Sequence, residues 1–210
     1  MSQPNHAAAA GHRDAEGAKI GMWLFIFTEI LLFGGLFLLY AVYRAANPQD
    51  FHFAATTLDT FLGTVNTLLL LTSSLTMALS IHALSRRKAR SSLVWILLTL
   101  TAGIGFLVIK GFEWSAKFHH GLYPNADELL RHTPGESLFY GLYFAMTGLH
   151  GVHLIIGILV LSVMAWFVFW TKAAEGDEHP WLVPLENSGL YWHLVDVVWI
   201  FLFPLFYLIS

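Results

Sequence analysis

The chain has 210 residues, of which 56% are hydrophobic and 12% are charged, and its formal net charge is −3. Soluble domains hold roughly twice that share of charged residues, so the composition indicates a protein embedded in a membrane for nearly all of its length. The small net charge argues against nucleic acid or another polyanion as a partner. Because the chain has no cysteine, disulfides, thiolate metal sites and covalently attached haem are excluded as well.

Five apolar stretches are long enough to cross a bilayer, which takes about 20 mostly apolar residues per helix. They cover residues 20–43, 58–84, 92–113, 137–170 and 188–209. Short polar joins separate them, and Pro48 breaks the helix after the first stretch. The predicted fold class is therefore all-α, a polytopic bundle of five transmembrane helices in one domain, residues 18–210, after an exposed tail, residues 1–17.

The distribution of lysine and arginine predicts how the helices are oriented, because these residues are enriched in cytoplasmic loops. With the N-terminus in the cytoplasm, seven of the eleven basic residues fall on the cytoplasmic side, including the run 86-RRKAR-90. The other four fall on the outer side, where the first loop is nearly neutral. The sequence thus predicts an N-in, C-out topology.

Ionisable side chains inside apolar segments are costly and are the informative residues of this chain. They are Glu29, Lys110, Glu113, His150, His153, His193 and Asp196, with Glu186 just before the last segment. Lys110 and Glu113 are three residues apart and are expected to neutralise each other near the outer surface.

The last segment carries a polar stripe. Its positions 186, 189, 193, 196 and 200 recur at helical spacing, so Glu186, Gly189, His193, Asp196 and Ile200 share one face, flanked by Trp192 and Trp199. Lipid cannot satisfy polar groups, so this face is expected to turn toward other helices.

The string 147-TGLHGVHLIIG-157 places His150 and His153 on one helix face among glycines. Two interpretations stay open at this point. The histidines could ligate a metal or haem, although haem needs ligands from opposite sides of its ring. Alternatively, they hydrogen-bond across a tight helix interface or to a lipid headgroup, since glycine lets helices approach closely.

Two strings carry a family resemblance. The string 192-WHLVDVVW-199, together with the glycine- and histidine-rich string over 147–157, resembles segments typical of subunit III of haem–copper oxidases. Glu186 stands shortly before the first string, as a Glu does in that family, and Glu113 resembles the Glu of a Glu–aromatic pair in the corresponding helix. The resemblance runs from about Ile20 to the C-terminus and is to the five-helix bacterial form, which lacks two N-terminal helices of longer members.

The resemblance implies an accessory subunit, without a redox centre, of a cytochrome c or quinol oxidase in the bacterial cytoplasmic membrane. Haem and copper are expected in partner subunits, with subunit I in direct contact and subunit II also in the complex. The family binds phospholipid between helices and supports proton uptake and the stability of subunit I. No catalytic or metal-ligating residue is expected here; the residues expected to bind lipid or join helices are Glu113, His150, His153, Glu186, Trp192, His193 and Asp196.

Glu29 matches the buried, carbodiimide-reactive Glu of the family. A carboxyl group in apolar surroundings is expected to be protonated, because the neutral form costs far less to bury. Glu29 is then either a structural hydrogen-bond donor to a neighbouring helix or a participant in proton transfer. The structural interpretation is favoured, since no chain of ionisable residues leads from Glu29 to either surface.

Other functions remain as alternatives. An independent proton carrier would use Glu29 and the polar stripe, but carriers often show internal repeats, and none is visible here. A haem-binding redox protein would use His150, His153 and His193. Within the family, a subunit of a nitric oxide reductase system is the third alternative.

Overall fold

The computed structural model of the chain describes residues 6–170 and 180–208, and all regular structure within these ranges is helical. Five of the helices are long and apolar enough to cross a membrane, which confirms the predicted all-α membrane fold. The elements are α1 (His6–Ala46), α2 (Pro48–Thr56), α3 (Thr60–Ser85), α4 (Ala89–His119), η1 (Leu129–Arg131), α5 (Pro134–Trp170), α6 (Leu182–Phe203) and η2 (Pro204–Leu208).

A proline and a capping aspartate set two of the helix boundaries, and some boundaries lie outside the predicted ranges. Pro48 ends α1 as expected, but it also begins the short helix α2, which the sequence analysis missed. The Asp59 side chain caps α3 by accepting hydrogen bonds from the backbone N–H groups of Phe61 (2.9 Å) and Leu62 (3.1 Å). The first helix begins at His6, well before the predicted residue 20, so helix covers much of the segment that was expected to be a tail.

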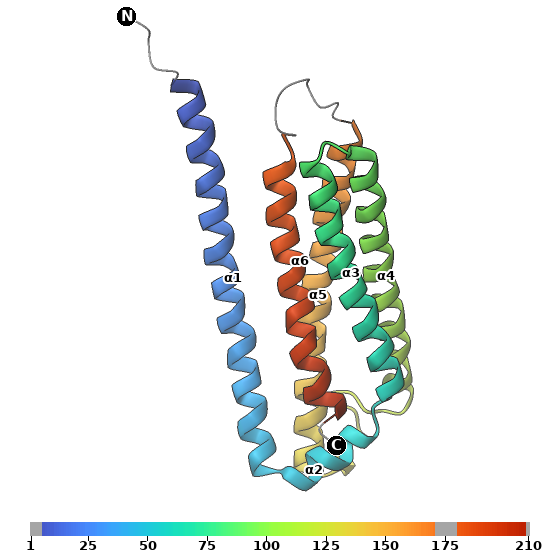
Figure 1. Cartoon of the computed structure of the whole chain (residues 1–210). Helices are drawn as coiled ribbons and strands as arrows, with labels where there is room; N and C mark the ends of the chain where they lie inside the picture. Colours follow the sequence, from blue (N-terminus) through green and yellow to red (C-terminus); the bar gives the residue numbers. More distant parts are fainter. Residues whose placement is uncertain (1–5, 171–179, 209–210) are drawn as a thin grey trace, which may run out of the picture.

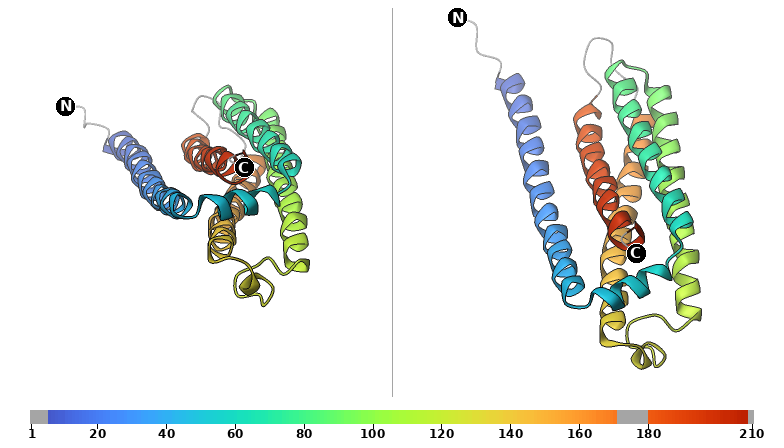
Figure 2. Two further views of the ribbon diagram at one scale, coloured as in Figure 1. Left: turned by 90° about the horizontal axis from the view of Figure 1, so that it is seen from below. Right: turned by 60° about the horizontal axis from the view of Figure 1, so that its bottom comes forward.

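Helices α3, α4, α5 and α6 form a bundle, and α1 lies to one side of it (Figures 1 and 2). α1 joins the bundle at the lower end through α2 and diverges from α6 toward its own N-terminus (Figure 1). Accordingly, 11% of the residues are buried in an 18-residue apolar stretch of α1, against 56% in such a stretch of the last span, which includes α6. The start of α1 and the end of α6 lie at opposite ends of the described structure (Figure 1), as expected for five membrane spans.

Trp192 of α6 fills the centre of the bundle between two glycines. A Cβ atom on Gly103 would lie 2.7 Å from the Trp192 ring, and one on Gly157 would lie 3.0 Å from it. The indole N–H donates a hydrogen bond to Ser73 Oγ at 3.0 Å. The small residues of α4 and α5 therefore provide the space for the bulky Trp192 side chain of α6.

The C-terminal end of α6 changes its winding at Pro204, where a π-helical turn, η2, follows. The last carbonyl groups of a helix have no intrahelical partner, and lipid cannot satisfy them. Neighbouring helices supply donors instead. Tyr40 OH donates to the carbonyl of Leu205 at 2.8 Å, and Thr60 Oγ1 donates to that of Tyr207 at 3.4 Å.

Replacing Gly103 with Ala should lower the free energy of unfolding by about 1–3 kcal/mol, because the added methyl group displaces the Trp192 ring in a packed interior. Gly111→Ala, on the same helix, is the matched control, since a Cβ atom there meets nothing within 4 Å. Thermal unfolding of both purified variants in detergent measures the difference. Equal stability of the two variants would contradict the packing assigned to Trp192.

Candidate functional site

Glu29 faces the bundle and pairs with His153 of α5. Its Oε2 lies 3.0 Å from His153 Nε2, and the two side chains are 13% and 12% exposed. The other ring nitrogen, Nδ1, lies 2.8 Å from the backbone carbonyl of Leu149. Tyr191 OH donates to the carbonyl of His153 at 2.9 Å, so α1, α5 and α6 meet at this point.

Because a backbone carbonyl only accepts hydrogen bonds, the Leu149 carbonyl requires a hydrogen on His153 Nδ1. A neutral His153 then presents Nε2 as an acceptor toward Glu29.

His150 lies apart from His153, although the two are three residues apart on one helix. It is 1% exposed, inside the bundle, with ring centroids of Phe106 and Trp199 at 5.4 and 5.2 Å. Neither of its ring nitrogens has a hydrogen-bond partner among the described residues. In residues 6–170 and 180–208, no group of three or more His, Cys, Asp or Glu side chains could hold a metal ion.

The polar stripe of α6 meets different neighbours along its length. Glu186 forms an ion pair with Lys19 of α1 at 3.2 Å. His193 Nδ1 lies 2.7 Å from Ser74 Oγ of α3. Asp196 is 2% exposed, and its carboxyl oxygens make no hydrogen bond to another described residue. The stripe ends there, because Ile200 is 42% exposed and the prediction that it faces inward is wrong.

Lys110 and Glu113 form the predicted pair at 3.2 Å, and both side chains are buried in the bundle. Lys110 Nζ also donates to Tyr143 OH (3.0 Å) and Tyr207 OH (2.5 Å). Each tyrosine in turn donates to Glu113 Oε1, at 2.6 and 2.5 Å. The lysine thus uses its three donors, and the closed ring of four side chains joins α4, α5 and η2.

Sequence reasoning missed both tyrosines of this ring. A tyrosine hydroxyl inside an apolar segment needs a partner, so Tyr143 and Tyr207 were identifiable as polar groups at membrane depth. No spacing rule connects them to Lys110, however, because they lie on other elements.

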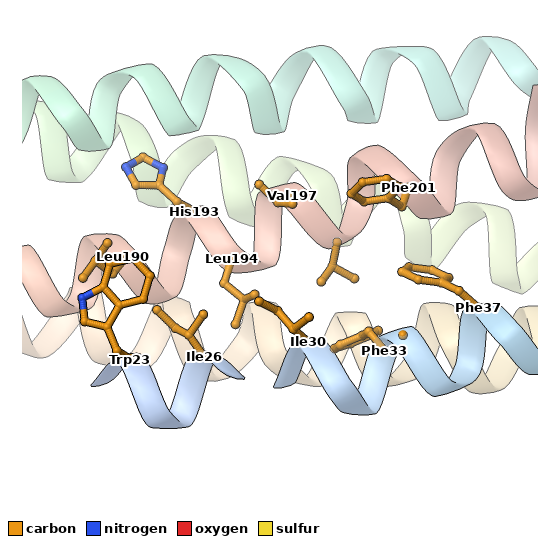
Figure 3. Close-up of a pocket in the computed structure, with 12 residues that line it drawn as sticks. Trp23, Ile26, Ile30, Phe33, Phe37, Leu190, His193, Leu194, Val197 and Phe201 are labelled. Carbon is orange, nitrogen blue, oxygen red and sulfur yellow. The ribbon is translucent and has the colours of Figure 1, made fainter. Parts of the chain in front are cut away.

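An apolar groove of about 410 Å³ runs between α1 and α6 (Figure 3). Ile26 and Ile30 of α1 and Leu194 of α6 lie between the two helices in that view, whereas His193 points away from α1 toward α3. The wall residues are Trp23, Ile26, Ile30, Phe33, Gly34, Phe37, Leu190, His193, Leu194, Val197, Val198 and Phe201. A neighbouring cavity shares Trp23, Leu190 and His193 and adds the polar residues Lys19, Glu186 and Asn187.

Comparisons with known proteins agree on one family. The family model for cytochrome c oxidase subunit III matches residues 4–210. The chain is 30% identical over 199 residues to cytochrome c oxidase subunit 3 of Thermostichus vulcanus, covering 95% of this chain and 90% of that protein. It is 28% identical over 194 residues to the Bacillus subtilis protein of that name, covering 91% and 86%. It is also 30% identical over 197 residues to quinol oxidase subunit 3 of Bacillus spizizenii, again covering 91% and 86%.

Replacing Lys110 with Met should destabilise the chain by about 3–5 kcal/mol, because Glu113 would remain buried without its cation. Glu113→Leu should destabilise the chain by a similar amount, because Lys110 would remain buried without its anion. In the double variant, the free energy of unfolding should fall by clearly less than the sum of the decreases in the two single variants, since no unpaired charge remains. Thermal or denaturant unfolding of the three variants measures this coupling, and strictly additive losses would show that the two residues do not act as a pair.

Proposed function

The chain belongs to the cytochrome c oxidase subunit III family, and from this premise we propose that it is an accessory subunit of a respiratory haem–copper terminal oxidase. In this proposal, oxygen is reduced at haem and copper held by partner subunits, and this chain has no redox centre of its own. It contacts subunit I directly, in a complex with subunit II, in the bacterial cytoplasmic membrane, with its N-terminus inside. Curated relatives from bacteria include both cytochrome c and quinol oxidase subunits.

The groove between α1 and α6 is the observation that carries the proposed lipid-binding role. Its walls are almost entirely apolar along the membrane-crossing part of both helices. Water gains few hydrogen bonds in such a groove, and the abundant apolar molecule around a membrane protein is lipid. Lys19, Glu186 and Asn187 line the adjoining cavity and supply polar groups at one end. A phospholipid fits this arrangement, because its apolar acyl chains would lie in the groove and its polar headgroup would lie in the adjoining cavity.

In this proposal, the lipid site is the groove between α1 and α6, and it does not include His150, which the sequence analysis had proposed as a lipid-binding or interhelical residue. That side chain is enclosed by Phe106 and Trp199 inside the bundle, so it cannot donate to a headgroup. His193 and Glu186, which were expected to bind lipid or join helices, line the cavity at the end of the groove. Trp192, Glu113 and Asp196 belong to the bundle interior, where each is at most 5% exposed.

Glu29 serves, in this proposal, as a neutral hydrogen-bond donor. The Leu149 carbonyl fixes a hydrogen on His153 Nδ1, so a neutral imidazole offers Nε2 as an acceptor. A protonated Glu29 completes that bond without placing any charge in the membrane interior. The charged alternative would leave an ion pair at this depth, with a larger desolvation cost. Glu29 therefore holds α1 against α5 through its hydrogen bond to His153, and this role does not require it to transfer protons.

Filling the groove should reduce bound lipid. Gly34 lines the groove and a Cβ atom there meets nothing within 4 Å, so Gly34→Leu should occupy the space of an acyl chain. Gly35→Leu is the matched control, because Gly35 has the same free space but is not among the lining residues. Phospholipid retained per purified complex, measured by mass spectrometry, should fall for the first variant only. An equal lipid content in both variants would exclude the groove as the site.

Removing this chain from the oxidase should slow turnover most at alkaline pH, where the protons that subunit I takes up are scarcest. Glu29→Gln should change turnover much less, because glutamine keeps a donor for His153 Nε2. Oxygen consumption against pH compares the complete complex, the complex without this chain and the Glu29→Gln complex. If Glu29→Gln abolished turnover while removal of the chain left it intact at high pH, both the accessory role and the neutral Glu29 would be wrong.

A further inference from the structure

Asp196 of α6 is a buried carboxyl group that takes part in neither the groove nor the ring of Lys110 and Glu113. It is 2% exposed, and its oxygens make no hydrogen bond to another described residue. An ionised carboxylate at this position would have no hydrogen-bond donor to offset its desolvation, which makes the charged form very costly to bury. We therefore expect Asp196 to hold a proton, and a protonated carboxyl group needs an acceptor.

The hydroxyl group of Ser74 on α3 lies beside this carboxyl group. It interacts with Asp196 without reaching hydrogen-bond geometry, and its Oγ lies 2.7 Å from His193 Nδ1. A hydroxyl group has one hydrogen to donate and lone pairs with which to accept. When Ser74 donates to His193 Nδ1, it can accept from a protonated Asp196 after a small rotation of either side chain. Ser74 then connects two residues of α6 that are three positions apart.

His193 continues this connection to the polar cavity at the end of the groove. Its side chain points away from α1 toward α3 (Figure 3), and it lines both the groove and that cavity. Glu186, on the same helix, also lines the cavity, and its side chain is 35% exposed. With Nδ1 accepting from Ser74, a neutral His193 carries its hydrogen on Nε2. The imidazole can therefore take up a proton at one nitrogen and release one at the other.

The pair of Glu29 and His153 has no such continuation. His153 Nδ1 faces the backbone carbonyl of Leu149, which accepts a hydrogen bond but has no hydrogen to pass on. His193 Nδ1 instead faces a hydroxyl group, which can both donate and accept. A carboxyl group and a histidine thus form a fixed contact in one place and an open relay in the other.

We propose that Asp196 is a proton-holding site and that it exchanges its proton with the polar cavity through Ser74 and His193. On release, the Asp196 proton passes to Ser74 Oγ, the Ser74 hydrogen passes to His193 Nδ1, and the Nε2 hydrogen leaves to water or a headgroup in the cavity. Asp196 is left as a carboxylate, and the reverse transfers restore its proton. The use of this site in proton uptake rests on the proposed accessory function, but the exchange itself does not.

The test follows hydrogen–deuterium exchange of the Asp196 carboxyl group by infrared spectroscopy, with the full chain reconstituted in phosphatidylcholine bilayers. A protonated carboxyl group gives a carbonyl stretching band, which shifts when deuterium replaces the hydrogen. Asp196→Asn should remove one such band and leave that of Glu29, so the difference between the two chains isolates Asp196. In the native chain, this band should exchange faster than the slowest backbone amides of α6, which exchange only when the bundle opens.

Variants of the two relay residues separate the relay from other routes. Ser74→Ala removes the hydroxyl group and should slow exchange of the Asp196 band by about tenfold or more, because the proton can then leave only through local opening. His193→Gln keeps a polar side chain that cannot take up a proton, and it should slow the exchange similarly. Ser80→Ala is the matched control and should exchange like the native chain. Ser80 is also buried on α3, but its hydroxyl donates to the Met77 carbonyl of its own helix at 2.8 Å.

Absence of the protonated Asp196 band from the native chain would overturn the proposal. Equally fast exchange in the native chain, Ser74→Ala and His193→Gln would overturn it too, because the proton would then bypass both residues. If Asp196→Asn fails to fold, Glu29→Gln removes the other expected band, and the remaining band reports on Asp196. Failure of the proposed accessory function would show instead in oxygen consumption by the complex, which this measurement does not involve.

Discussion

Lipid cannot satisfy a polar side chain inside the membrane, and the contacts that hold the helices of this chain together follow in large part from that constraint. The ring of Lys110, Glu113, Tyr143 and Tyr207 meets it most fully, because each hydroxyl both accepts from the lysine and donates to the carboxylate. The ring draws the C-terminal turn η2 against α4 and α5. Removing any one member would leave the others buried and unsatisfied, which makes the ring a strong determinant of how these elements pack.

The same constraint explains why α1 stands apart. Polar contacts spaced along the helix join it to α5, α6 and η2, among them those of Lys19 with Glu186, Glu29 with His153, and Tyr40 with the Leu205 carbonyl. Between these contacts, apolar side chains such as Ile26 and Ile30 line the groove toward α6. In water, the hydrophobic effect would close the space between α1 and α6, but in a bilayer lipid chains fill such space at little cost. A groove can therefore persist beside a helix that a few polar contacts hold in place.

Much of this fold could be predicted from the sequence, because its signals are local. Length and apolar content give the five membrane helices, Pro48 gives the first break, and a spacing of three residues gives the contact between Lys110 and Glu113. The helix α2 was missed because a short segment of mixed polar and apolar residues after a proline is typical of a loop. The pairing of Glu29 with His153 and the two tyrosine partners of Lys110 could not be predicted, since these partners come from elements far away in the sequence and no periodicity connects them.

The two histidines of helix α5 show where spacing stops being informative. Side chains three residues apart on a helix differ by about 60° in direction, which counts as one face in a sequence pattern. In a bundle, that angle separates two environments: His150 packs between aromatic rings of α4 and α6, and His153 reaches Glu29 on α1. An HxxH string in a membrane helix is therefore compatible with two unrelated roles. The direction of each imidazole is set by the neighbouring helices, and only the packing of the whole bundle distinguishes a shared ligand site from two separate contacts.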